Sequence, residues 1–307
     1  MNWFWIALIS PIVLALVNHI DKYVLSHRLK GRGVDAIFLF SSILAFGSIP
    51  AVFVLSGSVG VFSFSQILFL MISGAVGAFG FLLYLHSVFK EEISLSIAVF
   101  QLNPVWSYIL GLVFLGEVLT KNQIFASIII ILGVFIITLD FEELKLKRFV
   151  MRKSVLLFMG IASVLYAVQD VMFKYVVQED YFWAGVFWQI IGVVVLGILF
   201  YLFKKSSRKE LNSFLSNNNA KTFRINAFAE FLYLGANVVN TFSLLLAPVA
   251  LVSVVGSSQP LFVFLGSLLI ARFLPKISSE KLAKGHILHK LVSIGIVIIG
   301  SYLLYTA

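Results

Sequence analysis

Two apolar runs near the middle of the chain, at residues 93–115 and 124–139, constrain its fold more than any other feature. A helix needs ~20 residues to cross the hydrocarbon core of a bilayer, so we expect each run to form a membrane span. A short polar corner at residues 116–123 joins the two runs. Pro104 interrupts the first run and removes a backbone hydrogen-bond donor, which predicts a bend near residue 100.

The same layout returns near the end of the chain, where Pro260 follows Pro104 at an offset of 156 residues (260 − 104). A second echo joins residues 22–24 and 174–176, both Lys-Tyr-Val, at an offset of 152 (174 − 22). Two echoes at nearly one offset predict an internal duplication. We place a first repeat at residues 1–140, a charged linker at 141–153 and a second repeat at 154–307.

The corner between the two runs contains Gly116-Glu117, and the second run contains Gly133. Together with the mid-span proline, these features resemble the EamA repeat of the drug/metabolite transporter superfamily, and the resemblance covers nearly the whole chain. It implies an all-α integral membrane protein of ten transmembrane helices, arranged as two inverted five-helix repeats. It also implies a central cavity formed by spans 1, 3, 4, 6, 8 and 9, with spans 5 and 10 bracing the halves.

The composition is that of a membrane protein. Hydrophobic residues make up 60% of the chain and charged residues 12%, against roughly 45–50% and 25% in soluble domains. The chain has no cysteine, which excludes disulfides, thiolate metal sites and cysteine nucleophiles. We expect the partners to be the lipid bilayer and a small-molecule substrate, with no nucleic acid, and the protein to be a monomer or homodimer.

The net charge of +9 follows from the loops between spans. We expect ten spans, at roughly 3–25, 35–57, 66–89, 93–115, 122–140, 154–177, 182–203, 223–246, 249–274 and 287–305. Of the 23 lysine and arginine residues, all but Lys22, Lys121 and Lys174 fall in the loops that follow odd-numbered spans or at the span ends next to those loops. The positive-inside rule therefore predicts that these loops are cytoplasmic and that both termini lie outside the cytoplasmic membrane. One of these loops, at residues 204–222, is rich in Asn and Ser, and we expect it to be mobile.

Charged side chains inside apolar spans are costly unless they face a bundle interior or a wet cavity. Asn18 and Lys22 in the first span, and Asp170 and Lys174 in the sixth, form two pairs spaced four residues apart at matching repeat positions. They are candidates for lining a substrate cavity. The alternative is that both lysines lie near span ends and extend their ammonium groups toward the membrane surface.

The eighth span carries a stripe of polar residues on one helical face. Its members are Glu230, Tyr233, Asn237 and Asn240, followed by Thr241. By the 156-residue offset, Gly74, Gly77 and Tyr84 of the third span take the corresponding places. We expect a cavity at the repeat interface with its hydrogen-bonding groups mostly on the eighth span and the small glycines on the third, and Tyr84 is a further candidate for lining it. The alternative is that the two asparagines only bridge neighbouring helices.

Gln101, Asn103 and Gln259 flank the two prolines, where a bent helix frees a backbone carbonyl. These three side chains are candidates for contacting the substrate. The alternative is that they only donate hydrogen bonds to the freed backbone carbonyl. Trp106 and Trp188 lie deep enough in their spans to be candidate cavity walls. We expect Glu117 to have a structural role in fixing the corner between the fourth and fifth spans.

The chain lacks a Walker phosphate-binding loop, an HExxH motif and a GxSxG motif. We therefore expect no enzyme activity, no cofactor and no metal, and ion gradients as the energy source. Asp170 and Glu230 are the candidates for proton coupling.

The sequence favours a secondary transporter that moves a small metabolite by alternating access. Because the candidate cavity residues include both lysines and acids, an amino acid or related polar or amphipathic solute fits the cavity slightly better than a cation. The alternatives are a membrane enzyme acting on lipid or isoprenoid, and a non-transporting sensor or assembly subunit.

Overall fold

The computed structural model describes residues 2–24, 33–90, 99–138, 153–217, 220–273 and 284–307, which contain helices and no strand. In chain order the helices are α1 (Asn2–Val24), α2 (Val34–Ser56), α3 (Phe64–Lys90), α5 (Asn103–Leu110), the π-helical turn η2 (Gly111–Leu115), α6 (Lys121–Thr138), α8 (Lys153–Val176), the short η3 (Glu179–Tyr181), α9 (Phe182–Phe203), α10 (Lys205–Asn217), α11 (Ala220–Leu246), α12 (Val249–Gly256), α13 (Gln259–Phe273) and α14 (Lys284–Thr306). The all-helical fold expected from the apolar runs is present.

The expected number of ten spans is not confirmed. Within the described residues, seven helical stretches are long and apolar enough to cross a bilayer. Shorter apolar stretches at Asn103–Leu115, Lys121–Ile136 and Leu291–Thr306 occupy the places of the expected spans 4, 5 and 10. The first of these is short because its described helix begins only after the break next to Pro104, so it does not extend over the whole apolar run.

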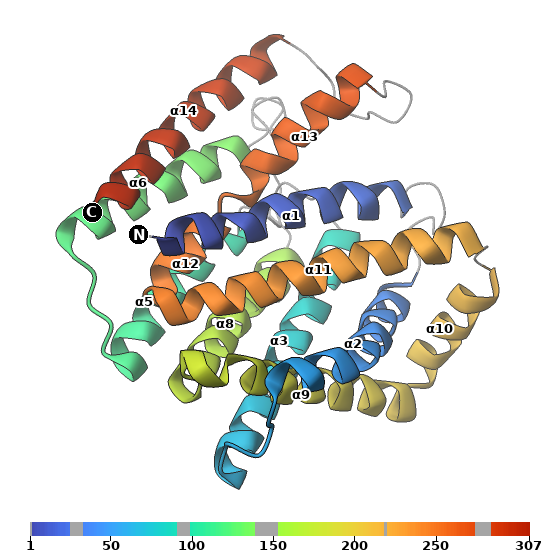
Figure 1. Ribbon diagram of the computed structural model, residues 1–307. Helices are drawn as coiled ribbons and strands as arrows, with labels where there is room; N and C mark the ends of the chain where they lie inside the picture. The colour runs from blue at the N-terminus through green and yellow to red at the C-terminus, as the bar shows by residue number, and fades with distance from the viewer. Residues whose placement is uncertain (1, 25–32, 91–98, 139–152, 218–219, 274–283) are drawn as a thin grey trace.

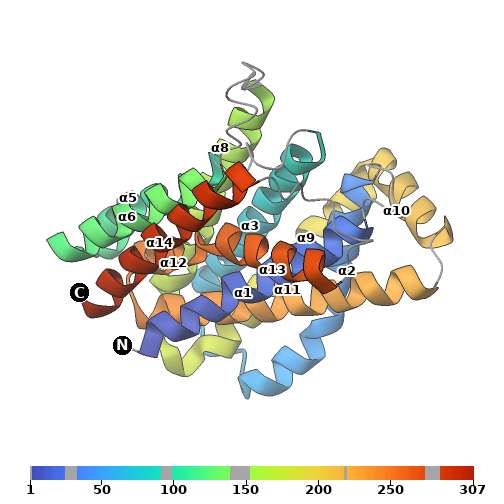
Figure 2. The same cartoon turned by 90° about the horizontal axis from the view of Figure 1, so that it is seen from above.

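The helices pack mainly between the first half of the chain (the described residues up to 138) and the second half (those from 153 onward). The main cross-half pairs are α1 with α11, α8 with α3, α3 with α9, α2 with α9, and α6 with α14. Figure 1 shows α6 and α14 side by side at one edge and α1 alongside α11 across the centre, and Figure 2 shows the same neighbours from above. The first membrane span of each half thus packs on the third membrane span of the other half.

Glycines allow α3 and α9 to approach backbone to backbone. A Cβ added to Gly74 would lie 1.9 Å from the carbonyl oxygen of Gln189, and one added to Gly192 would lie 1.8 Å from that of Met71. A Cβ on Gly77 would collide with the side chain of Gln169 on α8. Gly74 and Gly77 therefore serve helix packing, as small residues commonly do in membrane bundles. The prediction that they stand on a cavity wall was wrong.

The spans that contain Pro104 and Pro260 are both broken, where the sequence predicts a bend, whereas Pro11 and Pro50 lie inside the continuous helices α1 and α2. The backbone turns at residues 99–102, and Pro104 lies in the first turn of the new helix α5, where its missing N–H breaks no helical hydrogen bond. The second break, at residues 257–258, separates α12 from α13, with Pro260 in the first turn of α13. Helices α5 and α12 pack against each other, and the hydroxyl oxygens of Ser107 and Ser253 lie 2.8 Å apart.

The prediction of a mobile loop at residues 204–222 was wrong for most of that segment. Residues 205–217 form the amphipathic helix α10, which packs on α2 and α9. Its apolar residues Leu211 and Phe214 are three positions apart, on one face, and both are buried. The Phe214 ring lies 5.5 Å from the ring of Phe40, so the apolar face of α10 is part of the core.

Candidate substrate cavity

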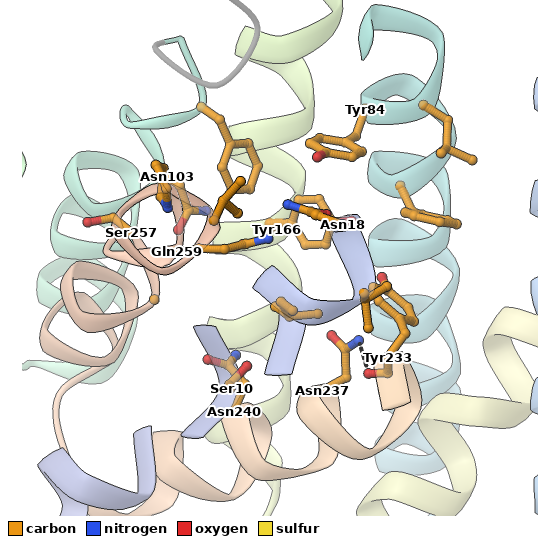
Figure 3. Close-up of a pocket in the computed structure, with 18 of the residues that line it drawn as sticks. Ser10, Asn18, Tyr84, Asn103, Tyr166, Tyr233, Asn237, Asn240, Ser257 and Gln259 are labelled. Atoms are coloured by element: carbon orange, nitrogen blue, oxygen red, sulfur yellow. Dashed lines mark hydrogen bonds between the residues drawn. The ribbon is translucent and has the colours of Figure 1, made fainter. Parts of the chain in front are cut away.

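A cavity of about 230 Å³ lies where α1, α3, α8 and α11 meet the two broken helices. Liquid water takes up about 30 Å³ per molecule, so the space suits a small solute. In Figure 3, Tyr233, Asn237 and Asn240 follow one another along α11, while Asn103 and Gln259 stand on the side of the broken helices. The cavity is therefore bounded by elements from both halves of the chain.

The structure gathers most of the predicted site residues around this one cavity. Those that line it are Asn18, Tyr84, Gln101, Asn103, Asp170, Glu230, Tyr233, Asn237, Asn240 and Gln259, with the helix-break residues Pro104 and Pro260. They come from the expected spans 1, 3, 4, 6, 8 and 9. Helices α2 and α10 also contribute, through residues that include Phe40 and Phe214. That these residues bind substrate stays a prediction.

Lys174 is placed differently from the expectation. It is not among the residues that line the cavity. Its ammonium nitrogen lies 2.6 Å from a Glu117 carboxylate oxygen and donates a 2.6 Å hydrogen bond to the Ala247 carbonyl. The sequence pattern paired Lys174 with Asp170 one turn away, but a partner 57 positions earlier in the chain (174 − 117) holds it instead. The side chain of Lys22 lies outside the described residues.

Sequence reasoning missed several polar residues of the cavity wall. They are Ser10, Tyr166, Gln169, Asn226, Ser253 and Ser257. A signal was available for part of this set. Tyr166, Gln169 and Asp170 stand at helical spacing on one face of α8, and Asn226 extends the α11 stripe by one turn before Glu230. A search that weighted neutral polar residues as heavily as charged ones would have found them.

Some of the lining groups already have protein partners. The Asn103 amide donates to the carbonyl of Ser163 on α8 at 2.9 Å. The Asn237 amide donates to the carbonyl of Tyr233 on its own helix, at 2.8 Å. The Ser41 hydroxyl on α2 donates to the Glu230 carboxylate at 2.5 Å, across the two halves. These bonds hold the side chains in place around the open space.

Aromatic rings form much of the remaining wall. The Phe100 ring lies 6.0 Å from the ring of Tyr84 and 5.6 Å from that of Tyr166. On the other side, the Phe81 ring lies 5.3 Å from that of Tyr233. The edge-on and tilted arrangements of these pairs are those that aromatic quadrupoles favour.

The two tryptophans expected as cavity walls do not line the cavity. The Trp188 indole N–H on α9 donates to the Val59 carbonyl at 2.9 Å and so ties α9 to the segment after α2. The Trp106 indole nitrogen on α5 is buried without a hydrogen-bond partner in the described part of the chain. Indole groups are large and mostly apolar, so depth within a span does not separate packing from cavity lining.

Glu117 forms the centre of a polar contact that we call the Glu117 latch, made of Glu117, Lys174 and the backbone at Ala247 and Val249. Besides the bond to Lys174, the second carboxylate oxygen of Glu117 accepts the backbone N–H of Val249, at 2.8 Å. Val249 is the first residue of α12, where a negative charge interacts favourably with the helix dipole. Glu117 therefore does more than fix its own corner, because it joins η2 to the second half of the chain.

A second polar contact, which we call the Asp35 cluster, joins Asp35 on α2 to Lys204, Ser207 and His86. One Asp35 oxygen lies 2.7 Å from the Lys204 ammonium and accepts a 2.7 Å hydrogen bond from Ser207. The other oxygen is 3.9 Å from the His86 ring. Lys204 directly follows α9, which begins at Phe182 next to the latch end of α8, so the two contacts lie at opposite ends of α9.

Residues 2–139 match the model of the EamA-like transporter family. This first part of the chain is therefore similar to that family. The family consists of membrane transporters of the drug/metabolite type, and together with the seven apolar helices it makes the protein a multi-pass membrane protein. Its members are transporters rather than enzymes, in agreement with the missing catalytic motifs.

The fold of the whole chain also matches solved structures. One of them, titled only "Crystal structure of protein", aligns with a TM-score of 0.69 over 99% of this chain and 98% of its own, at 12% sequence identity. That likeness shows the fold and nothing of the substrate. The comparison with curated proteins gives no match.

Proposed function

We propose that this protein is a secondary transporter that moves a small metabolite, of the size of an amino acid or a related polar or amphipathic solute, across the cytoplasmic membrane. The observation that supports it is the cavity itself. It holds about 230 Å³ between two broken helices from opposite halves, and it is lined by amides, hydroxyls and aromatic rings. Broken helices around a central site are typical of secondary transporters.

Alternating access would open this cavity first to one side and then to the other. The Glu117 latch and the Asp35 cluster both join the two halves, and they lie at opposite ends of α9. At ~1.5 Å per residue, α9 separates the ends by about the thickness of the hydrocarbon core. We assign the latch to one gate and the cluster to the other. By the distribution of basic residues, the Asp35 cluster faces the cytoplasm.

Binding to the cavity can be tested by thermal stabilisation of the purified full-length protein against amino acids, amines, sugars, nucleosides and organic acids. A ligand at 100 times its Kd should stabilise the protein by ~2.7 kcal/mol. The variant Asn240→Ala should lose the shift, because Asn240 lines the cavity. Asn212→Ala, on the exposed face of α10, should keep it. Loss of the shift in both variants, or in neither, would contradict the assignment of the site.

Proton coupling is the finer part of the proposal and rests on Asp170 and Glu230, the two acids of the cavity wall. In proteoliposomes with an imposed pH gradient, Asp170→Asn or Glu230→Gln should abolish uphill accumulation and leave exchange between internal and external substrate. Normal accumulation by both variants would show that the energy comes from elsewhere. Absence of any transport by the wild-type protein, with a flat binding panel, would favour a non-transporting role.

A further inference from the structure

The charged side chains that line the cavity, among the described residues, have one sign. The lining residues include two acids, Asp170 and Glu230, and among those with described side chains no Lys, Arg or His. Lys174 does not enter, because the Glu117 latch holds its ammonium group. The cavity is therefore an acidic space enclosed by neutral polar and aromatic side chains.

The two acids differ in their partners. Glu230 accepts a hydrogen bond from Ser41. Asp170 is only 9% exposed, and no hydrogen bond or ion pair engages its side chain within the described part of the chain. A buried carboxylate without a partner is costly, and it is stabilised when a proton or a cation neutralises it. Asp170 thus presents an unmatched acidic group to whatever occupies the cavity.

The surroundings of Asp170 suit an organic cation rather than a bare metal ion. Tyr166 lies one turn before it on α8 and lines the same cavity. The Phe100 ring packs against Tyr166, and Tyr84 and Tyr233 are further aromatic residues of the cavity wall. Aromatic faces attract ammonium groups and also pack against apolar carbon. The amides of Asn18 and Gln169 add oxygen atoms that can accept ammonium N–H groups.

A zwitterion fits this space less well. The carboxylate of an amino acid would lie in the same small cavity as Asp170 and Glu230, and like charges at short range repel. We propose, on the basis that the cavity is the transport site, that it selects a small amine with one positive charge and an apolar or aromatic body. Asp170 is the counter-ion of that amine. The cavity discriminates against solutes that also carry a carboxylate group.

The test compares an amino acid with the amine obtained by removing its carboxyl group. Binding of tyramine and tyrosine, and of phenethylamine and phenylalanine, is measured by calorimetry on the purified full-length protein. We expect each amine to bind at least tenfold more tightly than its parent amino acid. Equal binding, or tighter binding of the amino acids, would overturn the cation assignment.

The role of Asp170 is tested by Asp170→Asn, which should weaken amine binding at least tenfold, with Asp170→Glu restoring part of it. Asp180→Asn is the matched control, since Asp180 is an exposed acid in η3 outside the cavity. Unchanged amine binding in Asp170→Asn would overturn the proposal. If that variant fails to fold, the matched ligand pairs on the wild-type protein still decide it. Transport of amino acids without binding of amines would end this inference and leave the proposed function intact, whereas absence of any transported solute would end both.

Discussion

The Glu117 latch and the Asp35 cluster are polar contacts of different construction. In the latch, the Glu117 and Lys174 side chains are only 13% and 20% exposed, and both also bond to backbone at the α11–α12 junction. In the Asp35 cluster, Asp35 is buried, but its partner Lys204 is 43% exposed. The first contact is a nearly dry ion pair fixed to the backbone. The second is an ion pair with one partner exposed to solvent. Compared with the latch, its formation depends more on the packing of α10.

This difference has an energetic meaning. An ion pair shielded from water is costly to break on one side, because the remaining charge stays buried. A pair with one exposed partner loses little, because water replaces the missing group. The Glu117 latch should therefore act as a stiff gate, and the Asp35 cluster as a soft one.

The largest expected effect follows removal of Lys174 from the latch. Lys174→Met should lower the free energy of unfolding by about 3 kcal/mol, because Glu117 is left without its counter-ion. The measurement is denaturant unfolding of the purified protein, completed as a cycle with Glu117→Gln and the double variant. A coupling energy of about 1–3 kcal/mol is expected for such neighbours. Additive effects would show that the latch is not an interacting pair.

The next effect tests whether the two ends are held apart by a rigid centre. Gly192→Val should destabilise the protein by about 2 kcal/mol, because its side chain would meet the Met71 backbone on α3. Gly235→Val is the matched control on α11, since a Cβ there has no neighbour within 4 Å. Denaturant unfolding of the two purified variants compares their free energies of unfolding. A loss equally large in Gly235→Val would place the cause in helix propensity rather than in the α3–α9 contact.

The smallest effect on stability is expected at the soft end. Lys204→Met should cost about 1 kcal/mol or less, because Lys204 is partly exposed and Ser207 still donates to Asp35. High salt should weaken the wild-type contact and leave the variant unchanged. A loss as large as that of Lys174→Met would remove the distinction between a stiff and a soft end.

The features that could be predicted from sequence are those with a local physical cause. The two breaks lie next to Pro104 and Pro260, and a proline in the middle of an apolar run predicts such a bend from sequence. The stripe from Glu230 to Asn240 follows from helical spacing alone. The partner of Lys174 could not be predicted from sequence, because Glu117 is brought to it only by the packing of η2 against α8.

Two further interpretations of the sequence were wrong. Gly74 faces the backbone of α9 rather than the cavity, and nothing within α3 itself distinguishes those two surroundings. The many Ser, Asn and Lys residues around Leu211 and Phe214 led to the prediction of a loop where α10 forms. Average polarity over a segment hides an apolar face that two residues are enough to form.

The hydroxyls of Ser107 and Ser253, which meet between α5 and α12, also offer a handle on the motion. The chain contains no cysteine, so two thiols placed at these positions would be the only pair available for oxidation. A disulfide there would tie the broken helices of the two halves together covalently, and a reductant would release them. Transport that stops on oxidation and returns on reduction would show that these helices must separate in every cycle.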